Sequence, residues 1–210
     1  MTLMGEILKD AAMGVHVAQE PENLAGFAEP GCAAAIWHRD TCPDFQAWID
    51  ALNPDELPNA RLVLRCQNVR AALADVCNNA GLENGPHRQH LINDITALVR
   101  MFSDLMGAPF VRMRLDRIST NACRKFHVDA ITARLVCTYR GTGTQYGIAS
   151  NGNDPTRVFT LPTGDPILLR GTLWQEHPSA GLLHRSPPIE GTGETRLVLV
   201  VDPVFDVKDV

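Results

Sequence analysis

The sequence lacks several features that would place it in a common class. It has no run near the roughly 20 apolar residues that a membrane-spanning helix needs. Its start, MTLMGEILKDAAMG, has no basic segment followed by an apolar block, so we expect no signal peptide. Basic residues are outnumbered, with 19 Lys and Arg against 24 Asp and Glu. The net charge of -5 disfavours a nucleic-acid partner, because such binding depends on neutralising phosphates.

Familiar catalytic motifs are also missing. There is no GxSxG turn for a hydrolase nucleophile and no GxxxxGK[ST] phosphate loop. The glycines of GTGTQYG (141–147) follow a β-prone stretch with no helix behind it, which disfavours a dinucleotide site. The six cysteines form no CxxC pair, so we expect reduced thiols in a cytoplasmic protein. Cys32, His38 and Cys42 could supply three ligands of a zinc site, but no fourth ligand has a suitable spacing. We therefore interpret them as two buried thiols and a surface histidine.

The composition is that of a folded protein with a substantial core. The chain of 210 residues is 45% hydrophobic and 20% charged, and we predict one domain over 1–210. Residues 1–107 are predicted to be mainly helical. The strongest helices are expected at 60–80 and 87–107, the second with apolar residues every three or four positions. Shorter helices are expected at 3–13 and 43–52, and a strand or buried segment at 32–39.

After residue 108 the pattern changes to short β-prone segments divided by Gly, Pro, Asn and Asp. These segments are 109–119, 133–141, 157–162, 165–171, 181–186 and 195–204. Such spacing is typical of an all-β sandwich or barrel. We therefore predict an α+β fold in which a helical N-terminal half packs on a C-terminal antiparallel β-unit (108–210).

A histidine and a carboxylate lie two residues apart in the segment KFHVDAITARL (125–135). In a strand, His127 and Asp129 would project to the same face. Together they provide two of the three ligands of a 2-His-1-carboxylate metal site. A third ligand would come from downstream, from His177 in QEHPSAG or from His184 in GLLHRSPP. His184 is the better candidate, because a jelly roll folds early and late strands around one interior.

These residues resemble a known pattern. HVD (127–129), His184 and Arg196 are similar to the HxD…H…R pattern of the iron(II)- and 2-oxoglutarate-dependent dioxygenases. The C-terminal half also resembles an uncharacterised bacterial family with FHVD, TYRGxGT and LxHRSPP stretches. The resemblance implies a double-stranded β-helix (jelly roll) in which His127, Asp129 and His184 bind iron(II).

The same resemblance implies a 2-oxoglutarate site. The far carboxylate of the co-substrate needs a cationic partner, and Arg offers the best geometry. Arg196 is our first choice and Arg134 the second, with Tyr139 and Thr138 as hydroxyl donors. Trp174 would form part of the substrate wall. The alternative is that Arg134 is a structural ion-pair partner of Asp129, which would make Asp129 no metal ligand, and both interpretations stay open.

Two other functions remain open at this point. A cupin-like protein of metal homeostasis would hold zinc or another metal at the same triad without oxygenase activity. An interaction module that has lost its metal is the third reading. The primary substrate, a small molecule or a protein, and the oligomeric state are not predicted.

Overall fold

Two β-sheets position the functional side chains in this computed structural model, which describes residues 14–149, 152–174, 181–206 and 208. The larger sheet has seven strands in the order β1-β2-β8-β5-β10-β4-β3. Their bounds are Val15–Ala18, Ala34–Trp37, Pro166–Arg170, Ala133–Arg140, Arg196–Val204, Phe110–Ile118 and Ala60–Leu64. The smaller sheet has the order β7-β6-β9, with bounds Phe159–Thr160, Gln145–Ile148 and Leu182–Arg185.

The chain alternates between the two sheets as it runs from β4 to β10. After β4 it passes beside β9 of the small sheet at an isolated antiparallel bridge between His127 and His184. It returns to the large sheet as β5, crosses to β6 and β7, returns as β8, crosses as β9 and ends as β10. This path is a double-stranded β-helix, the jelly roll expected of the C-terminal half. The six β-prone segments predicted after residue 108 are confirmed as strands β4, β5, β7, β8, β9 and β10, whereas β6 was not predicted.

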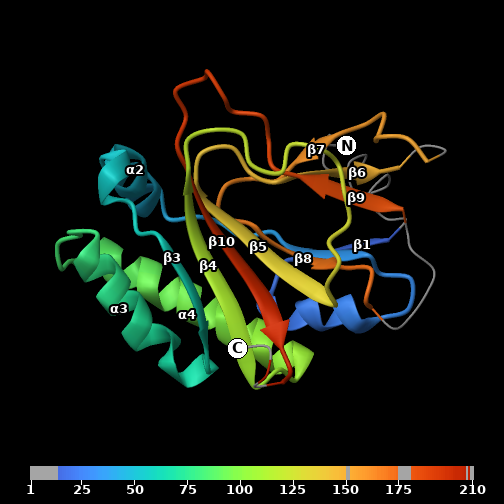
Figure 1. The fold of residues 1–210 in the computed structure, drawn as a ribbon, viewed down its shortest axis with the longest axis horizontal. Coiled ribbons are helices and arrows are strands. Elements are labelled where there is room, and N and C mark those ends of the chain that lie inside the picture. The colour runs from blue at the N-terminus through green and yellow to red at the C-terminus, as the bar shows by residue number, and fades with distance from the viewer. Residues whose placement is uncertain (1–13, 150–151, 175–180, 207, 209–210) are drawn as a thin grey trace.

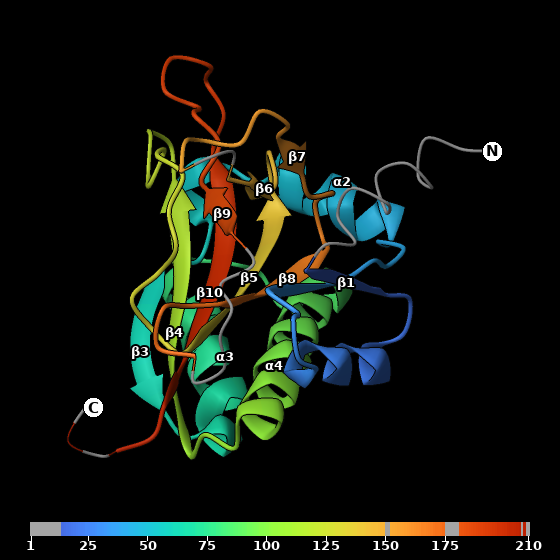
Figure 2. The same ribbon diagram turned by 90° about the vertical axis from the view of Figure 1, so that its right-hand side faces the viewer.

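Helices cover one side of the large sheet. They are η1 (Pro21–Ala28), α2 (Pro43–Ala51), η2 (Pro54–Glu56), η3 (Cys66–Asn68), α3 (Val69–Asn79) and α4 (Pro86–Met106). Figure 1 shows α3 and α4 on one side of the molecule and the small sheet on the opposite side, and Figure 2 shows the same separation in a second view. Within the described ranges, no helix is long and apolar enough to cross a membrane.

Helix α4 confirms the prediction made for 87–107. It begins with Pro86 at its first position, where the missing N–H costs nothing. It ends at Gly107, whose left-handed backbone (φ 60°) lets its N–H bond to the carbonyl of Ser103. The apolar stripe that faces the sheet is fully buried and consists of Leu91, Ile92, Ile95, Leu98, Val99 and Phe102. Burying a side chain of this kind contributes about 1.5–3 kcal/mol, so the stripe anchors the helix to the sheet.

The two faces of the large sheet differ in character. Alternate residues of β5 and β10 pack against the helices, namely Leu135, Cys137, Tyr139, Leu197, Leu199 and Val201. The intervening residues face the small sheet, and among them Val136 and Val198 pack against Tyr146. Arg134, Thr138, Arg196 and Asp202 have the same parity as Val136 and Val198, so their side chains project into the space between the sheets.

The prediction of a mainly helical N-terminal half is wrong in part. Strands β1, β2 and β3 come from this half and extend the large sheet at both edges. The predicted helix at 60–80 begins only at 69, because 60–64 pairs antiparallel with β4. Residues 60–64 form a strand because they pair with the long strand β4, and this pairing outweighs the local preference for a helix. The helix expected at 3–13 lies outside the described residues, whereas α2 confirms the one expected at 43–52.

Candidate metal centre

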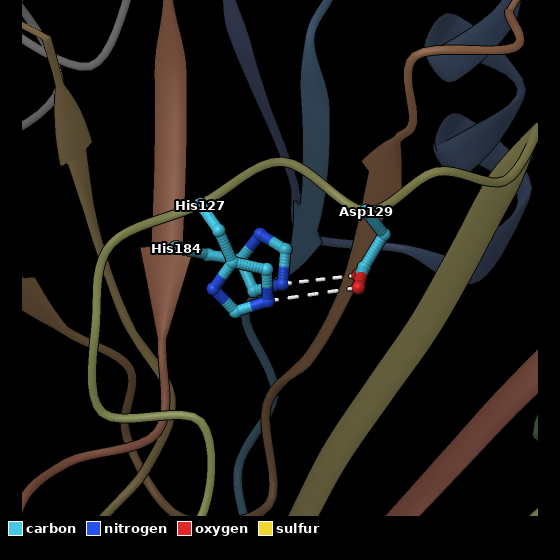
Figure 3. Close-up of side chains that lie close together, drawn as sticks. All are labelled: His127, Asp129 and His184. Carbon is cyan, nitrogen blue, oxygen red and sulfur yellow. Dashed lines mark ion pairs between the residues drawn. The ribbon is translucent and has the colours of Figure 1, made fainter.

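Three side chains from different parts of the chain meet between the two sheets. One ligand atom from each of His127, Asp129 and His184 can be chosen so that all three lie within 4.8 Å of one another. Nε2 of His184 lies 3.1 Å from Oδ2 of Asp129, and Nε2 of His127 lies 3.6 Å from Oδ1. Figure 3 shows both imidazole rings directed toward the carboxylate. The structure therefore brings together the three residues that the sequence pattern singles out.

The backbone fixes the two histidines relative to each other. His127 and His184 exchange N–H···O=C hydrogen bonds of 3.0 Å in both directions, and their ring centroids are 4.5 Å apart. Nδ1 of His127 lies 2.8 Å from the carbonyl oxygen of Lys125. A carbonyl only accepts hydrogen bonds, so Nδ1 carries the proton and Nε2 keeps its lone pair. This is how metal-binding histidines are usually oriented by their surroundings.

His184 is buried, and burial lowers the pKa of its imidazole, although the contact with Asp129 acts in the opposite direction. The ring is therefore neutral at pH 7 and its nitrogen lone pair is available. Two imidazoles and one carboxylate form the donor set that suits iron(II), zinc and related divalent ions.

The carboxylate of Asp129 has one oxygen without a hydrogen bond. Oδ1 forms an ion pair with Nη1 of Arg134 at 2.7 Å. Oδ2 is buried and lies near His184, but it has no hydrogen-bond partner among the described residues. Burial by itself raises the pKa of this carboxyl, but His184, Arg134 and His127 outweigh it and lower the pKa to about 2. An ionised, buried and unbonded carboxylate oxygen is costly, and a divalent metal ion would compensate it.

Arg134 holds Asp129 in place from behind. Its Nε and Nη2 bind both oxygens of Asp202 on β10 at 2.7 and 2.9 Å, while Nη1 binds Asp129. The guanidinium is thus occupied on both edges by carboxylates of the protein. Arg134 can therefore pair with Asp129 while Asp129 serves as a metal ligand, because the ion pair uses Oδ1 and leaves Oδ2 for the metal. As a partner for a co-substrate carboxylate, Arg134 is less suitable than Arg196.

Arg196 is a buried cation among neutral partners. Its side chain is only 1% exposed. Nε donates to the carbonyl of Thr142 at 2.6 Å, Nη1 to the hydroxyl of Ser186 at 3.1 Å and Nη2 to that of Thr138 at 3.3 Å. Burial lowers the pKa of the guanidinium to about 10, although Glu194 acts in the opposite direction. A buried charge without a directly bonded carboxylate is the arrangement expected at an anion-binding site.

Two residues proposed from the sequence lie elsewhere. Tyr139 points to the helical side of the sheet, where its hydroxyl donates to Oδ2 of Asp94 at 2.6 Å. Its neighbours in β5 on that face are buried apolar side chains, so it cannot reach the metal centre. Trp174 stacks on Arg170 (4.3 Å) and packs edge-on against Phe27 (5.2 Å), which also places it on the helical side. His177 lies outside the described residues.

A pocket of about 110 Å³ opens beside the metal centre. Its polar walls include His127, His184, Arg134, Arg114 and Ser186, the last of which bonds to Arg196. Its apolar walls consist of Ile118, Val136, Val198 and Val200, together with Ala122. The pocket is therefore a small cavity with a metal-binding edge, cationic walls and an aliphatic surface.

Sequence reasoning missed Arg114 and Asp202. Arg114 lies in VRMRLD (111–116), which alternates between apolar and charged residues, whereas Asp202 ends the apolar run LVLVVD (197–202). In the first segment Arg112, Arg114 and Asp116 share a face, which the period of two would have revealed. The ion pair of Asp202 with Arg134 spans 68 residues, and no local pattern predicts it.

Comparison with solved structures gives the class of fold. The dioxygenase for auxin oxidation 1 from Arabidopsis thaliana, solved as a complex with 2-oxoglutarate, aligns with a TM-score of 0.53 over 93% of this chain and 94% of that chain, at 9% identity. The dioxygenase for auxin oxidation from rice aligns with a TM-score of 0.52 over 94% of this chain and 84% of that chain, at 12% identity. The protein therefore has the jelly-roll fold of these dioxygenases, with helical and sheet layers in common.

The chain itself belongs to the family described as "Protein of unknown function (DUF1826)", whose model matches residues 18–202. A search of curated proteins found no match. The three candidate metal ligands, the residues that line the pocket and Arg196 all lie within the matched range.

Proposed function

We propose that this protein is an iron(II)- and 2-oxoglutarate-dependent oxygenase. The observation that carries the proposal is the convergence of three ligand atoms within 4.8 Å, one of them from a buried carboxylate whose second oxygen has no hydrogen bond in the described chain. Two histidines and one carboxylate occupy one face of a metal ion and leave the opposite positions open. The dioxygenase fold supports the same assignment.

His127, Asp129 and His184 would hold the metal, and Arg196 would bind the far carboxylate of 2-oxoglutarate. When bound, iron(II) and 2-oxoglutarate supply the oxygen activation and the electrons for the reaction. Arg134 keeps Asp129 ionised and oriented, because it binds Oδ1 and is itself held by Asp202. The carbonyl of Lys125 orients the ring of His127 by binding Nδ1, so Nε2 is the nitrogen that faces the metal position.

Arg196 is suited to a carboxylate because three of its five N–H groups bond to neutral oxygens of the described residues. Ser186, one of those partners, also lines the pocket, so an anion there can approach the guanidinium. A carboxylate at this point would compensate the buried charge. The apolar wall of Val136 and Val198 suits the methylene groups of 2-oxoglutarate.

We also propose a reducing, cytoplasmic location. All six cysteines are unpaired, and two of them are exposed. Free exposed thiols persist where glutathione and thioredoxin keep them reduced.

The test is an anaerobic titration of the metal-free protein with iron(II) and then 2-oxoglutarate, followed by visible absorption. A charge-transfer band from the chelate is expected in the wild type and not in His127→Ala. His87→Ala, which changes a histidine on α4 that stacks on Trp48, is the matched control and should keep the band. Bound iron without a band would refute the dioxygenase proposal, and tight zinc binding would then favour the cupin-like alternative.

A further inference from the structure

Two cations in the pocket wall, Arg114 and Arg185, have no role in the proposed chemistry, and Nε of Arg185 already bonds to Oε1 of Gln145 at 2.8 Å. Arg114 lies on β4 and lines the pocket together with His127 and His184. Its side chain is 24% exposed, yet its Nε is buried and has no hydrogen-bond partner in the part of the chain that the structure describes. A guanidinium with an unbonded buried N–H favours an added acceptor, because that group has already lost its water.

Among the described residues, no carboxylate fills this position. Asp202 approaches Nη2 of Arg114 only to 3.8 Å, because both of its oxygens are bound by Arg134 at 2.7 and 2.9 Å. Asp116, two residues along β4, forms its ion pair with Arg61 at 3.3 Å. One carboxylate thus serves two arginines, and Arg114 is the one held less closely.

Arg114 is also remote from the anion site assigned to 2-oxoglutarate. Across the β4–β10 ladder Arg114 pairs with Val200, whereas Arg196 pairs with Ile118. Four residues of strand separate the two positions, which corresponds to about 13 Å. A single 2-oxoglutarate bound at Arg196 therefore leaves Arg114 for a second anion, on the side of the pocket where Arg134 holds Asp129.

We propose that Arg114 binds the carboxylate of the primary substrate, a small monocarboxylic acid with an apolar body. A planar carboxylate can receive two parallel N–H bonds from Nε and Nη of one guanidinium. Asp116 in the pocket wall disfavours a doubly charged phosphate by repulsion, and Val198 and Val200 offer an aliphatic surface. The cavity of about 110 Å³ admits a small acid and no folded partner. This inference rests on the proposed function, because it assigns the substrate of that site.

The test uses the Nε–H resonances of arginine in nitrogen-15 correlation spectra of the zinc-loaded protein with 2-oxoglutarate present. Acetate, butyrate, benzoate and phenylacetate are titrated, with phenylacetamide as the neutral counterpart of the last. The Arg114 resonance is identified by its loss in Arg114→Gln. Arg117→Gln is the matched control, since Arg117 lies on the same strand but points to the other face and bonds to Asp55.

We expect at least one acid to shift the Arg114 resonance saturably, and phenylacetamide to leave it unchanged. Affinity for that acid, measured in every variant by isothermal titration calorimetry, should fall at least tenfold in Arg114→Gln, stay unchanged in Arg117→Gln and recover in part in Arg114→Lys. The inference is overturned if no acid shifts the resonance, if binding survives in Arg114→Gln, or if inorganic phosphate binds more tightly than every acid. A shift of the Arg196 resonance by 2-oxoglutarate reports separately on the proposed function.

Discussion

Replacing Arg196 with Met separates the effect of its buried guanidinium on protein stability from its effect on 2-oxoglutarate binding. The side chain is 1% exposed, and burial lowers its pKa from 12.5 to about 10 while Glu194 acts in the opposite direction. A shift of this size costs the folded protein about 3 kcal/mol. Because the pKa of this basic group is lower in the folded protein than in the unfolded chain, the destabilisation by the buried charge is fully present below pH 10. It is relieved as pH rises from 10 toward 12.5, where the unfolded chain binds more protons.

The substitution also removes three hydrogen bonds, each contributing about 1 kcal/mol. Loss of the desolvation cost and loss of the bonds nearly cancel, and Met fills much of the same volume. We therefore expect the free energy of unfolding of the metal-free protein to change by no more than about 1 kcal/mol at neutral pH. Binding of 2-oxoglutarate should weaken by about 2–5 kcal/mol, which is about 30-fold or more.

Urea unfolding followed by circular dichroism measures the first quantity, and anaerobic titration of the iron(II) protein with 2-oxoglutarate measures the second. Arg88→Met is the matched control, because Arg88 is equally buried and bonds to the carbonyls of Leu82 and Ala74 and to Asn78 on the helical side. It should keep its affinity for 2-oxoglutarate. Wild-type affinity in Arg196→Met, or a stability loss beyond about 3 kcal/mol, would refute the reasoning.

Three further predictions concern the metal centre and the thiols. The pKa of Asp129 is about 2 against 3.8 ordinarily, so its charge stabilises the metal-free protein by about 2 kcal/mol above pH 3.8, and this is lost as pH falls through 2. The difference in the free energy of unfolding between wild type and Asp129→Asn, measured with urea, should therefore become smaller as the pH falls from 6 to 3. Gly171→Ala should lower stability by about 1–3 kcal/mol and weaken metal binding, because its Cβ would overlap the carbonyl of Ile131. Exposed Cys42 should react with iodoacetamide at pH 8 before Cys137, whose pKa burial raises to about 12.

Each of these has a clear contrary result. A gap that is constant with pH would show that Asp129 is not selectively stabilised as the anion. Gly85→Ala is the control for Gly171, since no atom lies within 4 Å of its Cβ position, and equal effects of the two would contradict the packing argument. Mass spectrometry that finds Cys137 alkylated as fast as Cys42 in the native protein would contradict its burial.

Local patterns were sufficient for several elements. The stripe of apolar residues in 87–107 identified α4, because a helix needs only its own period to define its buried face. The spacing of His127 and Asp129 identified two members of the metal centre. Period-two alternation in β5 also separates two of the proposed site residues: Arg134 and Tyr139 have opposite parity, so they cannot both face one site.

Other features depend on segments that are distant in sequence. Strand β1 exists through its parallel pairing with β2, and residues 60–64 form a strand because β4 offers them an edge. Propensity alone does not decide such cases, since pairing partners override it. The proposal of a single domain over 1–210 remains a prediction.

The sequence by itself determined which chemistry the chain can offer: two histidines, a carboxylate and an arginine, in an order typical of metal-dependent oxygenases. Tertiary structure decided their roles. It joined His184 to His127 by a backbone bridge, bound Arg134 to Asp202, buried Arg196 among neutral oxygens, and left Arg114 lining the pocket with a buried Nε–H that has no partner among the described residues. The reason is that an ion pair or a ligand set is a property of three-dimensional proximity, and only the alternation of the chain between two sheets created it.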